Sequence, residues 1–214
     1  MKISSRLRHN ILVMPPEIRE ASGIFIYGRR IKSLVFTTDL AIIKNCDADA
    51  VFAVYPFTPQ QSISDAIIRA AAVPVFAGIG GGITKGPRTV RLARDAESQG
   101  AFGVVLNSPT SSRDLRAVSA AVDIPVVITV TSDKANVRDR LRNGASIINV
   151  AAGSRTPDIV RSIRSGYPDI PVIASGGNQP DSIRETILAG ANAITYTPPT
   201  TKELFSEIME KYRD

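Results

Sequence analysis

The stretch that decides the fold is 170–203, IPVIASGGNQPDSIRETILAGANAITYTPPTTKE. It contains a short apolar run, 171–174, followed by the glycine pair Gly176 and Gly177. Such a run is typical of a strand buried on both faces in a parallel sheet, and the glycines allow a tight turn close to a ligand. A proline-initiated helical pattern and a second apolar run at 193–196 come next. The stretch therefore predicts a strand, a glycine turn, a helix, another strand and a last helix.

The same unit repeats through most of the chain. Helical patterns separate eight apolar runs, which begin near Ser33, Ala50, Val73, Ala101, Pro125, Ser146, Pro171 and Asn192. The spacing of about 23 residues is typical of a compact strand–helix repeat. Eight such units in succession predict a single closed (βα)8 TIM barrel over 33–214. An open, doubly wound parallel sheet is the alternative.

A separate N-terminal extension, 1–32, precedes the predicted barrel. The alternating pattern that follows Gly23, IFIYGRRIKSL, predicts a β-hairpin. A hairpin at this point either plugs the N-terminal mouth of the barrel or pairs with a partner subunit. His9, the single histidine of the chain, lies in this extension, and we expect it to have a surface or packing role.

The bulk composition is that of an ordinary globular chain. With 214 residues and 43% hydrophobic content, it is long enough for one sizeable core. Its apolar runs are shorter than the roughly 20 residues that a membrane helix needs. The apolar piece at 11–14 is also too short for the core of a signal peptide, so we expect a cytoplasmic protein with no membrane partner.

The formal net charge of +6 raises the question of nucleic-acid binding. The arginines are, however, spread over several predicted helices, and aromatic residues make up only 6% of the chain. We therefore interpret the arginines as parts of solvated helix faces and expect no nucleic-acid partner. A positive field also favours a small anionic metabolite as ligand, and the hairpin together with the basic helices favours a homodimer.

Polar residues follow the predicted strands, and in a TIM barrel these positions meet at one mouth. Hydroxyls, amides and glycines predominate there, and charges are few. This combination suits a polar, sugar-like ligand held by neutral hydrogen bonds. The candidate substrate-binding residues are Asn107, Thr129 and Asn149. The alternative for each Ser or Thr at the mouth is that it caps the following helix.

Asp39, after the first barrel strand, is the candidate general base. Its alternative role is the N-cap of the helix that follows. Tyr55 and Lys85 are the candidate acids or anion-stabilising groups. Lys85 belongs to a glycine-rich loop, 80–86, which we interpret as a flap over the mouth. The alternative is a solvated lysine on a flexible loop.

The end of the chain resembles a known superfamily. A Gly-Gly turn at 176–177, Ala-Gly-Ala at 189–191 and a last helix are similar to the end of the phosphate-binding (βα)8 barrels, the group that includes the ribulose-phosphate-binding barrels. The resemblance implies a phosphate on the loops after the last two strands. Its candidate ligands are Ser175, Gly176, Gly177, Thr197 and Thr200. Pro198 and Pro199 depart from the pattern, because they donate no N–H group.

The residue types that the sequence lacks at these positions argue against some catalytic mechanisms and cofactors. No lysine lies within a predicted strand, which argues against a Schiff-base aldolase with its lysine on a strand, and Lys85 is the only easy substitute. No cluster of His or Cys exists in the sequence to hold a transition metal. We therefore expect no cofactor, while a Mg²⁺ ion that arrives with a phosphate stays open. A flavin mononucleotide (FMN) is the alternative cofactor, since FMN would use the same phosphate corner.

These features predict an enzyme that acts on a small phosphorylated, sugar-like metabolite. The expected reaction is a metal-independent acid–base step of a lyase, an isomerase or a hydrolase. Two alternatives stay open. One is an FMN-binding barrel, and the other is a non-enzymatic protein that binds a metabolite or serves in an assembly.

Overall fold

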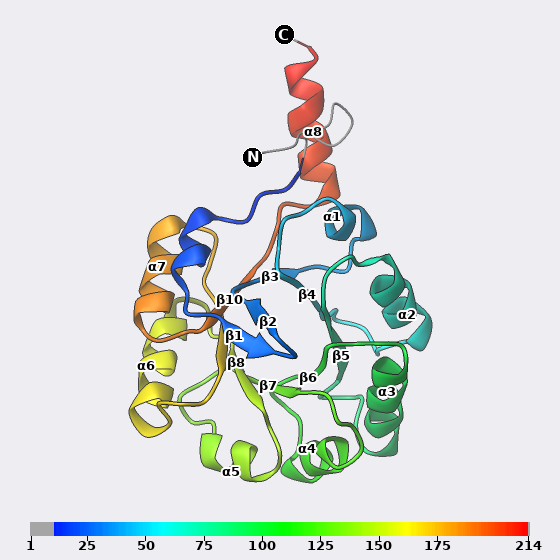
Figure 1. The fold of residues 1–214 in the computed structure, drawn as a ribbon, viewed down its shortest axis with the longest axis vertical. Helices are drawn as coiled ribbons and strands as arrows, with labels where there is room; N and C mark the ends of the chain where they lie inside the picture. The colour runs from blue at the N-terminus through cyan, green and yellow to red at the C-terminus, as the bar shows by residue number, and fades with distance from the viewer. Residues whose placement is uncertain (1–10, 214) are drawn as a thin grey trace.

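The computed structural model describes residues 11–213 and shows a closed barrel of eight parallel strands, in the order β10-β3-β4-β5-β6-β7-β8-β9 (Figure 1). The strands are β3 (Ser33–Phe36), β4 (Ala50–Ala53), β5 (Val75–Gly80), β6 (Gly103–Leu106), β7 (Val126–Val130), β8 (Ile147–Val150), β9 (Val172–Ser175) and β10 (Ala193–Tyr196). The predicted (βα)8 barrel is confirmed, and the open sheet is excluded because β10 pairs with β3. His9 lies outside the described residues.

One helix follows each barrel strand. The helices are α1 (Leu40–Lys44), α2 (Gln61–Ala70), α3 (Pro87–Ser98), α4 (Ser112–Ser119), α5 (Val137–Arg142), α6 (Thr156–Gly166), α7 (Pro180–Leu188) and α8 (Thr201–Lys211). Several begin where the sequence offers a capping side chain, because the first turn of a helix has free N–H groups. Ser111 and Asn136, for example, accept hydrogen bonds from the backbones of α4 and α5. Across residues 11–213, none of the helices is long and apolar enough to cross a membrane.

The strand side chains divide between two environments. One buried cluster draws members from all eight barrel strands and therefore fills the barrel: Leu34, Ala50, Phe52, Phe76, Val105, Val127, Ile147, Ile173 and Ala193 are among them. Alternate strand residues, such as Val35, Ile148 and Ile194, join two other clusters that include helix side chains. Because both faces of each strand are buried, the strands appear in the sequence as continuous apolar runs.

The predicted hairpin is formed by β1 (Ile24–Ile26) and β2 (Arg29–Ile31), which pair antiparallel. Tyr27 and Gly28 turn the chain with positive φ values of 47° and 76°, as a two-residue hairpin loop requires. The isoleucines of the hairpin belong to the cluster that fills the barrel, and the Tyr27 ring meets Phe102 edge-on at 5.1 Å between centroids. The hairpin thus closes the N-terminal end of the barrel, and Figure 1 shows it lying across the barrel centre.

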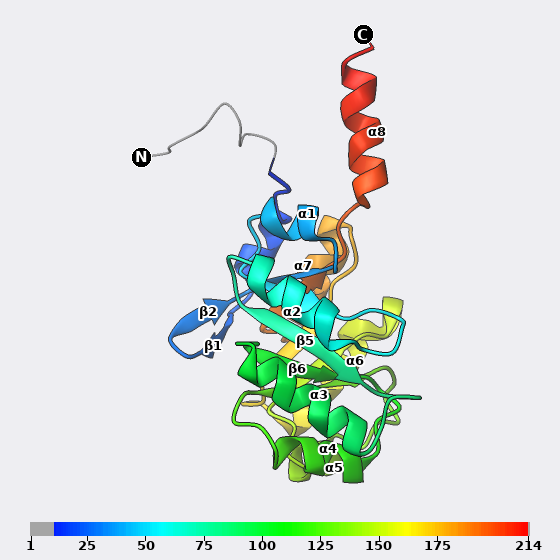
Figure 2. The same cartoon turned by 90° about the vertical axis from the view of Figure 1, so that its right-hand side faces the viewer.

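Helix α8 extends away from the barrel in both views (Figures 1 and 2). At the outer face of β10 and β3, where the last helix of a barrel would pack, buried residues that precede the hairpin join the strand clusters, and of α8 Leu204 packs against the cluster of Val35. The residues before the hairpin include the 3₁₀ helix η1 (Pro16–Glu20), whose Ile18 is buried in the same cluster as Ile194, and Met14, which is buried in the cluster of Val35. The apolar side chains of α8 that stay exposed are Phe205, Ile208 and Met209, and Tyr212, which follows the helix, is also exposed.

The position of the hairpin predicts a difference between two neighbouring substitutions. Ile31 is 2% exposed, whereas Phe25 on the outer face of the hairpin is 68% exposed. Ile31→Ala should lower the free energy of unfolding by about 2 to 4 kcal/mol, because it opens a cavity beneath the barrel. Phe25→Ala should change it by less than about 1 kcal/mol. Urea unfolding measures both, and equal effects would show that the hairpin does not seal the barrel.

Candidate functional site

Four polar side chains form the last inward layer on one side of the barrel. Thr129, Asn149, Ser175 and Thr195 each follow, two residues later, an apolar residue of the barrel-filling cluster. Side chains two apart on a strand share a face, so these four point to the barrel axis at its C-terminal end. The Asn149 Nδ2 donates to Thr129 Oγ1 at 3.2 Å, and the hydroxyls of Ser175 and Thr195 are 3.2 Å apart. We call these four residues the inner polar ring.

The other side of the mouth is apolar or lacks side chains. Phe36 and Val54 continue the inward faces of β3 and β4, and Gly78 lies on β5. The Phe36 ring lies against Phe52 with 6.1 Å between the centroids. At Gly78, an added Cβ would come within 3.1 Å of the Ala53 carbonyl oxygen, so a side chain there would crowd β4. The mouth therefore offers a ligand one polar wall and one apolar wall.

Asn149 has a side-chain atom without a hydrogen-bond partner. The residue is 4% exposed, and its Oδ1 is buried with no donor in reach. The Thr129 hydroxyl can either accept or donate, so each orientation of the amide satisfies one amide atom and leaves the other free. A buried polar atom without a partner costs about 1 to 3 kcal/mol. A buried polar atom without a partner, beside other polar groups, calls for an explanation, and a ligand that supplies the missing hydrogen bond is one.

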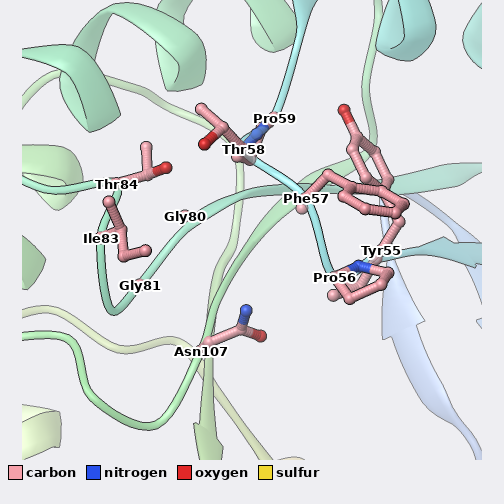
Figure 3. A pocket seen from close by; sticks show the side chains of 12 residues that line it. Tyr55, Pro56, Phe57, Thr58, Pro59, Gly80, Gly81, Ile83, Thr84 and Asn107 are labelled. Carbon is pink, nitrogen blue, oxygen red and sulfur yellow. The ribbon is translucent and has the colours of Figure 1, made fainter.

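A cavity of about 140 Å³ adjoins the mouth between β4, β5 and β6 (Figure 3). Tyr55 and Asn107 line it, together with the glycine loop after β5. The Tyr55 hydroxyl accepts a hydrogen bond from the backbone N–H of Gln60 at 2.8 Å, which holds the ring in place. Phe57 and Ile83 stand exposed at the rim. Two of the predicted site residues, Tyr55 and Asn107, therefore share this cavity.

The glycine loop turns back tightly against β6. The N–H of Gly81 donates to the Thr84 carbonyl at 3.0 Å, and Gly81 has a φ of 123°. A Cβ at Gly81 would lie 2.7 Å from the Cβ of Asn107, so only glycine allows this approach. Lys85, at the end of the loop, lines a separate groove between α3 and α4 and not the cavity beside Tyr55. The catalytic role of Lys85 stays a prediction.

Asp39 serves as the N-cap of α1. One carboxylate oxygen accepts from the N–H groups of Ala41 and Ile42 at 2.8 and 3.3 Å, and the other accepts from the Thr201 hydroxyl. The hydrogen bond from Thr201, aided by the two backbone donors, lowers the pKa of Asp39 below its ordinary value. A carboxylate with both oxygens engaged is a weaker base. The structure thus shows the capping role, and the role as general base stays a prediction.

The predicted phosphate corner is formed only in part. Gly176 and Gly177 make the turn from β9 into α7, and the Ser182 hydroxyl donates to the Gly176 carbonyl at 2.7 Å. Thr200 begins α8, and its N–H and hydroxyl both donate to the Glu203 carboxylate, at 2.7 and 2.8 Å. Thr197 is exposed beyond β10. The donors of Thr200 are therefore occupied, whereas Ser175 faces the mouth in the inner polar ring.

No family model and no curated protein sequence matches this chain. Solved structures share its fold. Phosphonopyruvate hydrolase matches with a TM-score of 0.66 at 15% identity, over 85% of this chain and 80% of its own. A 2,3-dimethylmalate lyase, described as a PEP mutase/isocitrate lyase superfamily member, gives 0.64 at 13%, over 91% and 82%. A putative dihydrodipicolinate synthetase from Pseudomonas aeruginosa gives 0.61 at 18%, over 85% and 78%. These likenesses confirm the TIM barrel, but the specific resemblance expected, to ribulose-phosphate-binding barrels, is not the one found.

The prediction that no cofactor takes part is overturned by one of these comparisons. A second structure of phosphonopyruvate hydrolase, with a TM-score of 0.65 to this chain, is a complex with oxalate and Mg²⁺. The described part of this chain, 11–213, contains no group of three or more His, Cys, Asp or Glu side chains placed to hold a metal ion. Its residues thus do not form a metal cage made of protein groups alone.

Sequence reasoning found much of the mouth but missed Thr195. Asn107, Thr129, Asn149 and Ser175 were predicted, and the structure places them at the C-terminal ends of β6 to β9. At the last strand the sequence favours Thr197, which follows the strand, as a ligand-binding residue. In the structure it is Thr195 that contacts Ser175. Because residues i and i+2 of a strand share a face, Thr195 points inward with Ala193 of β10, and this alternation identifies it.

The cap on α1 predicts a pH-dependent contribution to stability. Because its folded pKa is lowered, Asp39 contributes fully above its ordinary pKa of 3.8, and the contribution is lost as the pH falls through the folded value. Asp39→Ala should lower the free energy of unfolding by about 1 kcal/mol at pH 7. The difference from the parent should shrink below pH 3.8. Urea unfolding at several pH values measures this. A difference independent of pH would contradict the ionised cap.

The inner polar ring predicts two substitutions with opposite effects on the unliganded protein. Asn149→Leu removes the buried atom that has no partner and should raise the free energy of unfolding by about 1 kcal/mol. Thr195→Val removes a hydroxyl that is bonded to Ser175, and it should lower that free energy by about 1 kcal/mol. Urea unfolding in the absence of ligands gives both values. Destabilisation by Asn149→Leu would mean that its amide is satisfied in the free protein.

Proposed function

We propose that this chain is an enzyme for a small, oxygen-rich anion, a phosphorylated or carboxylic acid, that binds above the inner polar ring. The observation that carries the proposal is the buried amide of Asn149, which has one atom without a partner inside the mouth. The hydrolase and the lyase that share the fold act on small acids of this kind, as their names state. The proposed reaction is that of a lyase, a hydrolase or an isomerase, and a sugar-like phosphate belongs to the same ligand class.

The inner polar ring would hold the oxygens of the ligand. Thr129, Ser175 and Thr195 supply hydroxyls, and Asn149 supplies an amide; these groups are fixed on strands and not on loops. Hydrogen bonds formed in a partly dry site are stronger than those in water. Preorganised donors of this type stabilise a negative charge that develops on a carbonyl or hydroxyl oxygen. The ring would therefore orient the ligand and stabilise an oxyanion.

The remaining parts of the mouth have distinct roles in this proposal. The N-terminus of α7 and the N–H groups of the Gly176–Gly177 turn would face the anionic end of the ligand, because helix N-termini carry partial positive charge. Tyr55 and Asn107, in the cavity on the opposite wall, are the groups proposed to exchange a proton with the ligand or to polarise it. Asp39 and Thr200 are left out, because their polar atoms are engaged.

One observation favours a second candidate, a barrel that binds such an anion without converting it. Asp39, the carboxylate that follows β3, has both oxygens in hydrogen bonds. In this candidate the inner polar ring recognises the anion, and no carboxylate takes a proton from it. Binding and turnover must therefore be measured separately.

The test is a ligand screen with matched variants. Oxalate, phosphonopyruvate, 2,3-dimethylmalate and sugar phosphates are added to the parent protein with and without Mg²⁺, and the unfolding temperature is followed. A ligand at 100 times its Kd should stabilise the parent by about 2.7 kcal/mol. Asn149→Leu should abolish this gain, and Ser98→Ala, an exposed position on α3, should retain it.

The outcomes separate the two candidates. Product formation from a stabilising compound, detected by NMR, supports the enzyme, and stabilisation without product across the screen supports the binder. The proposed site is wrong if no compound stabilises the parent or if Asn149→Leu keeps the full response.

A further inference from the structure

A groove of about 920 Å³ lies between α3 and α4, outside the mouth. The glycine loop and the start of both helices form it. Its charged residues are Lys85, Arg91, Arg94 and Arg113, with Asp114 as the one carboxylate. We call this surface the α3–α4 groove. Its volume is within the range of pockets that hold small molecules, about 300 to 1,000 Å³.

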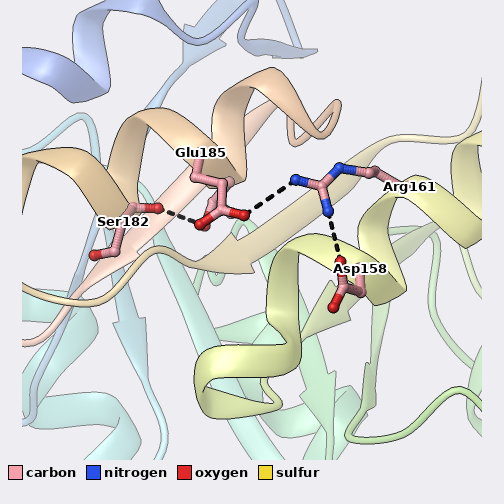
Figure 4. A network of polar contacts seen from close by, with 5 residues as sticks. Asp158, Arg161, Ser182 and Glu185 are labelled. Carbon is pink, nitrogen blue, oxygen red and sulfur yellow. Dashed lines mark hydrogen bonds and ion pairs between the residues drawn. The ribbon is translucent and has the colours of Figure 1, made fainter.

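The four cations of the α3–α4 groove are not paired. Among residues 11–213 none of them makes an ion pair, although Asp114 lies in the same groove. Arginines on other helices behave differently. Arg161 of α6, for example, contacts Asp158 at 2.5 Å and Glu185 of α7 at 3.1 Å (Figure 4). The positive charge of the α3–α4 groove is therefore not neutralised by the protein.

Two buried hydroxyls in the wall of the groove also lack partners. Thr89 is 1% exposed and Thr110 is 5% exposed, and neither Oγ1 has a hydrogen-bond partner. Thr89 lies in the first turn of α3, and Thr110 directly precedes Ser111, the N-cap of α4. The N-cap of α3 is Gly86, whose carbonyl accepts hydrogen bonds from the N–H groups of Thr89 and Val90, at 3.0 and 3.3 Å. Two helix starts and two unbonded hydroxyls thus meet at one groove.

We propose that the α3–α4 groove binds a small organic phosphate with at least two negative charges. Arginine guanidinium groups bind phosphate oxygens with paired hydrogen bonds. The unbonded hydroxyls of Thr89 and Thr110 in the wall of the groove can add further hydrogen bonds. Val90 and Ala117 supply an apolar wall for the body of the ligand. No aromatic side chain lines the groove, so it lacks the stacking surface that single-stranded nucleic acids use. A compact phosphate ester therefore fits it better than a nucleic acid does.

The α3–α4 groove is linked to the mouth through the glycine loop. Gly81 and Thr84 line both the groove and the cavity beside Tyr55. A phosphate bound by Lys85 and the arginines would fix this loop from its outer side. The groove is thus a second anion site, separate from the inner polar ring, that holds one wall of the mouth in place.

Isothermal titration calorimetry tests the proposal with two probes, inorganic pyrophosphate and fructose 1,6-bisphosphate, at about 0.15 M salt. The groove variant is Arg91→Gln, Arg94→Gln, Arg113→Gln. The control is Arg88→Gln, Arg138→Gln, Arg142→Gln, which removes the same charge from exposed arginines that do not line the groove. The groove variant should bind at least about tenfold more weakly, the effect of losing one charge-assisted bond. The control should stay within about twofold of the parent.

Asn149→Leu separates this proposal from that for the mouth, because it should leave binding in the groove unchanged. Circular dichroism verifies that each triple variant folds. Equal loss of affinity in both triple variants would overturn the proposal, since it would show diffuse electrostatic attraction. No binding of either probe by the parent protein would also overturn it. So would binding of single-stranded RNA through the groove arginines without binding of the probes.

Discussion

Strict alternation of side chains along the strands is the constraint on which this structure depends. In a closed parallel barrel one set of residues must fill the interior, and the other must pack under the helices. On β7 to β10 the inward set changes from apolar to polar within two residues, as from Ile147 to Asn149 and from Ala193 to Thr195. A shift of one residue would bury the polar side chains under the helices. The apolar core therefore fixes both the register and the position of the inner polar ring.

The barrel and its hairpin could be predicted because their signals are local and repeated. Few folds are compatible with runs of apolar residues at regular spacing, and a closed barrel is the one that buries both faces of eight strands. Roles that depend on tertiary contacts could not be predicted. The pattern around Asp39 suits a base or a cap equally, and only the contact with Thr201 of α8 shows that both oxygens are used. Similarly, sequence spacing does not reveal that Lys85 lines the groove between α3 and α4 and not the cavity beside Tyr55.

The position of α8 also depends on tertiary contacts that the sequence does not reveal. The spacing of its apolar residues predicts a helix with one apolar face, but it does not specify the surface against which that face packs. The residues before the hairpin can cover the same outer face of β10 and β3. Because two prolines follow Met14, the sequence shows no helix or strand pattern there that would predict this packing. In the structure Ile18 of this segment is fully buried in the cluster of Ile194, while α8 extends away from the barrel. In the two proposals, neutral donors in the mouth orient one anion, and unpaired cations in the α3–α4 groove attract another.

Side-chain amide NMR can show whether a ligand supplies the missing hydrogen bond of the Asn149 amide. Asn143 is the internal control, because it is equally buried, at 4% exposure, and its amide is bonded to Arg116 and Asp139. The Asn149 signal, assigned by its loss in Asn149→Leu, should shift during titration with a compound that stabilises the protein, and the Asn143 signal should not. If a stabilising compound shifts neither signal, or shifts both equally, the ligand does not bind at the Asn149 amide.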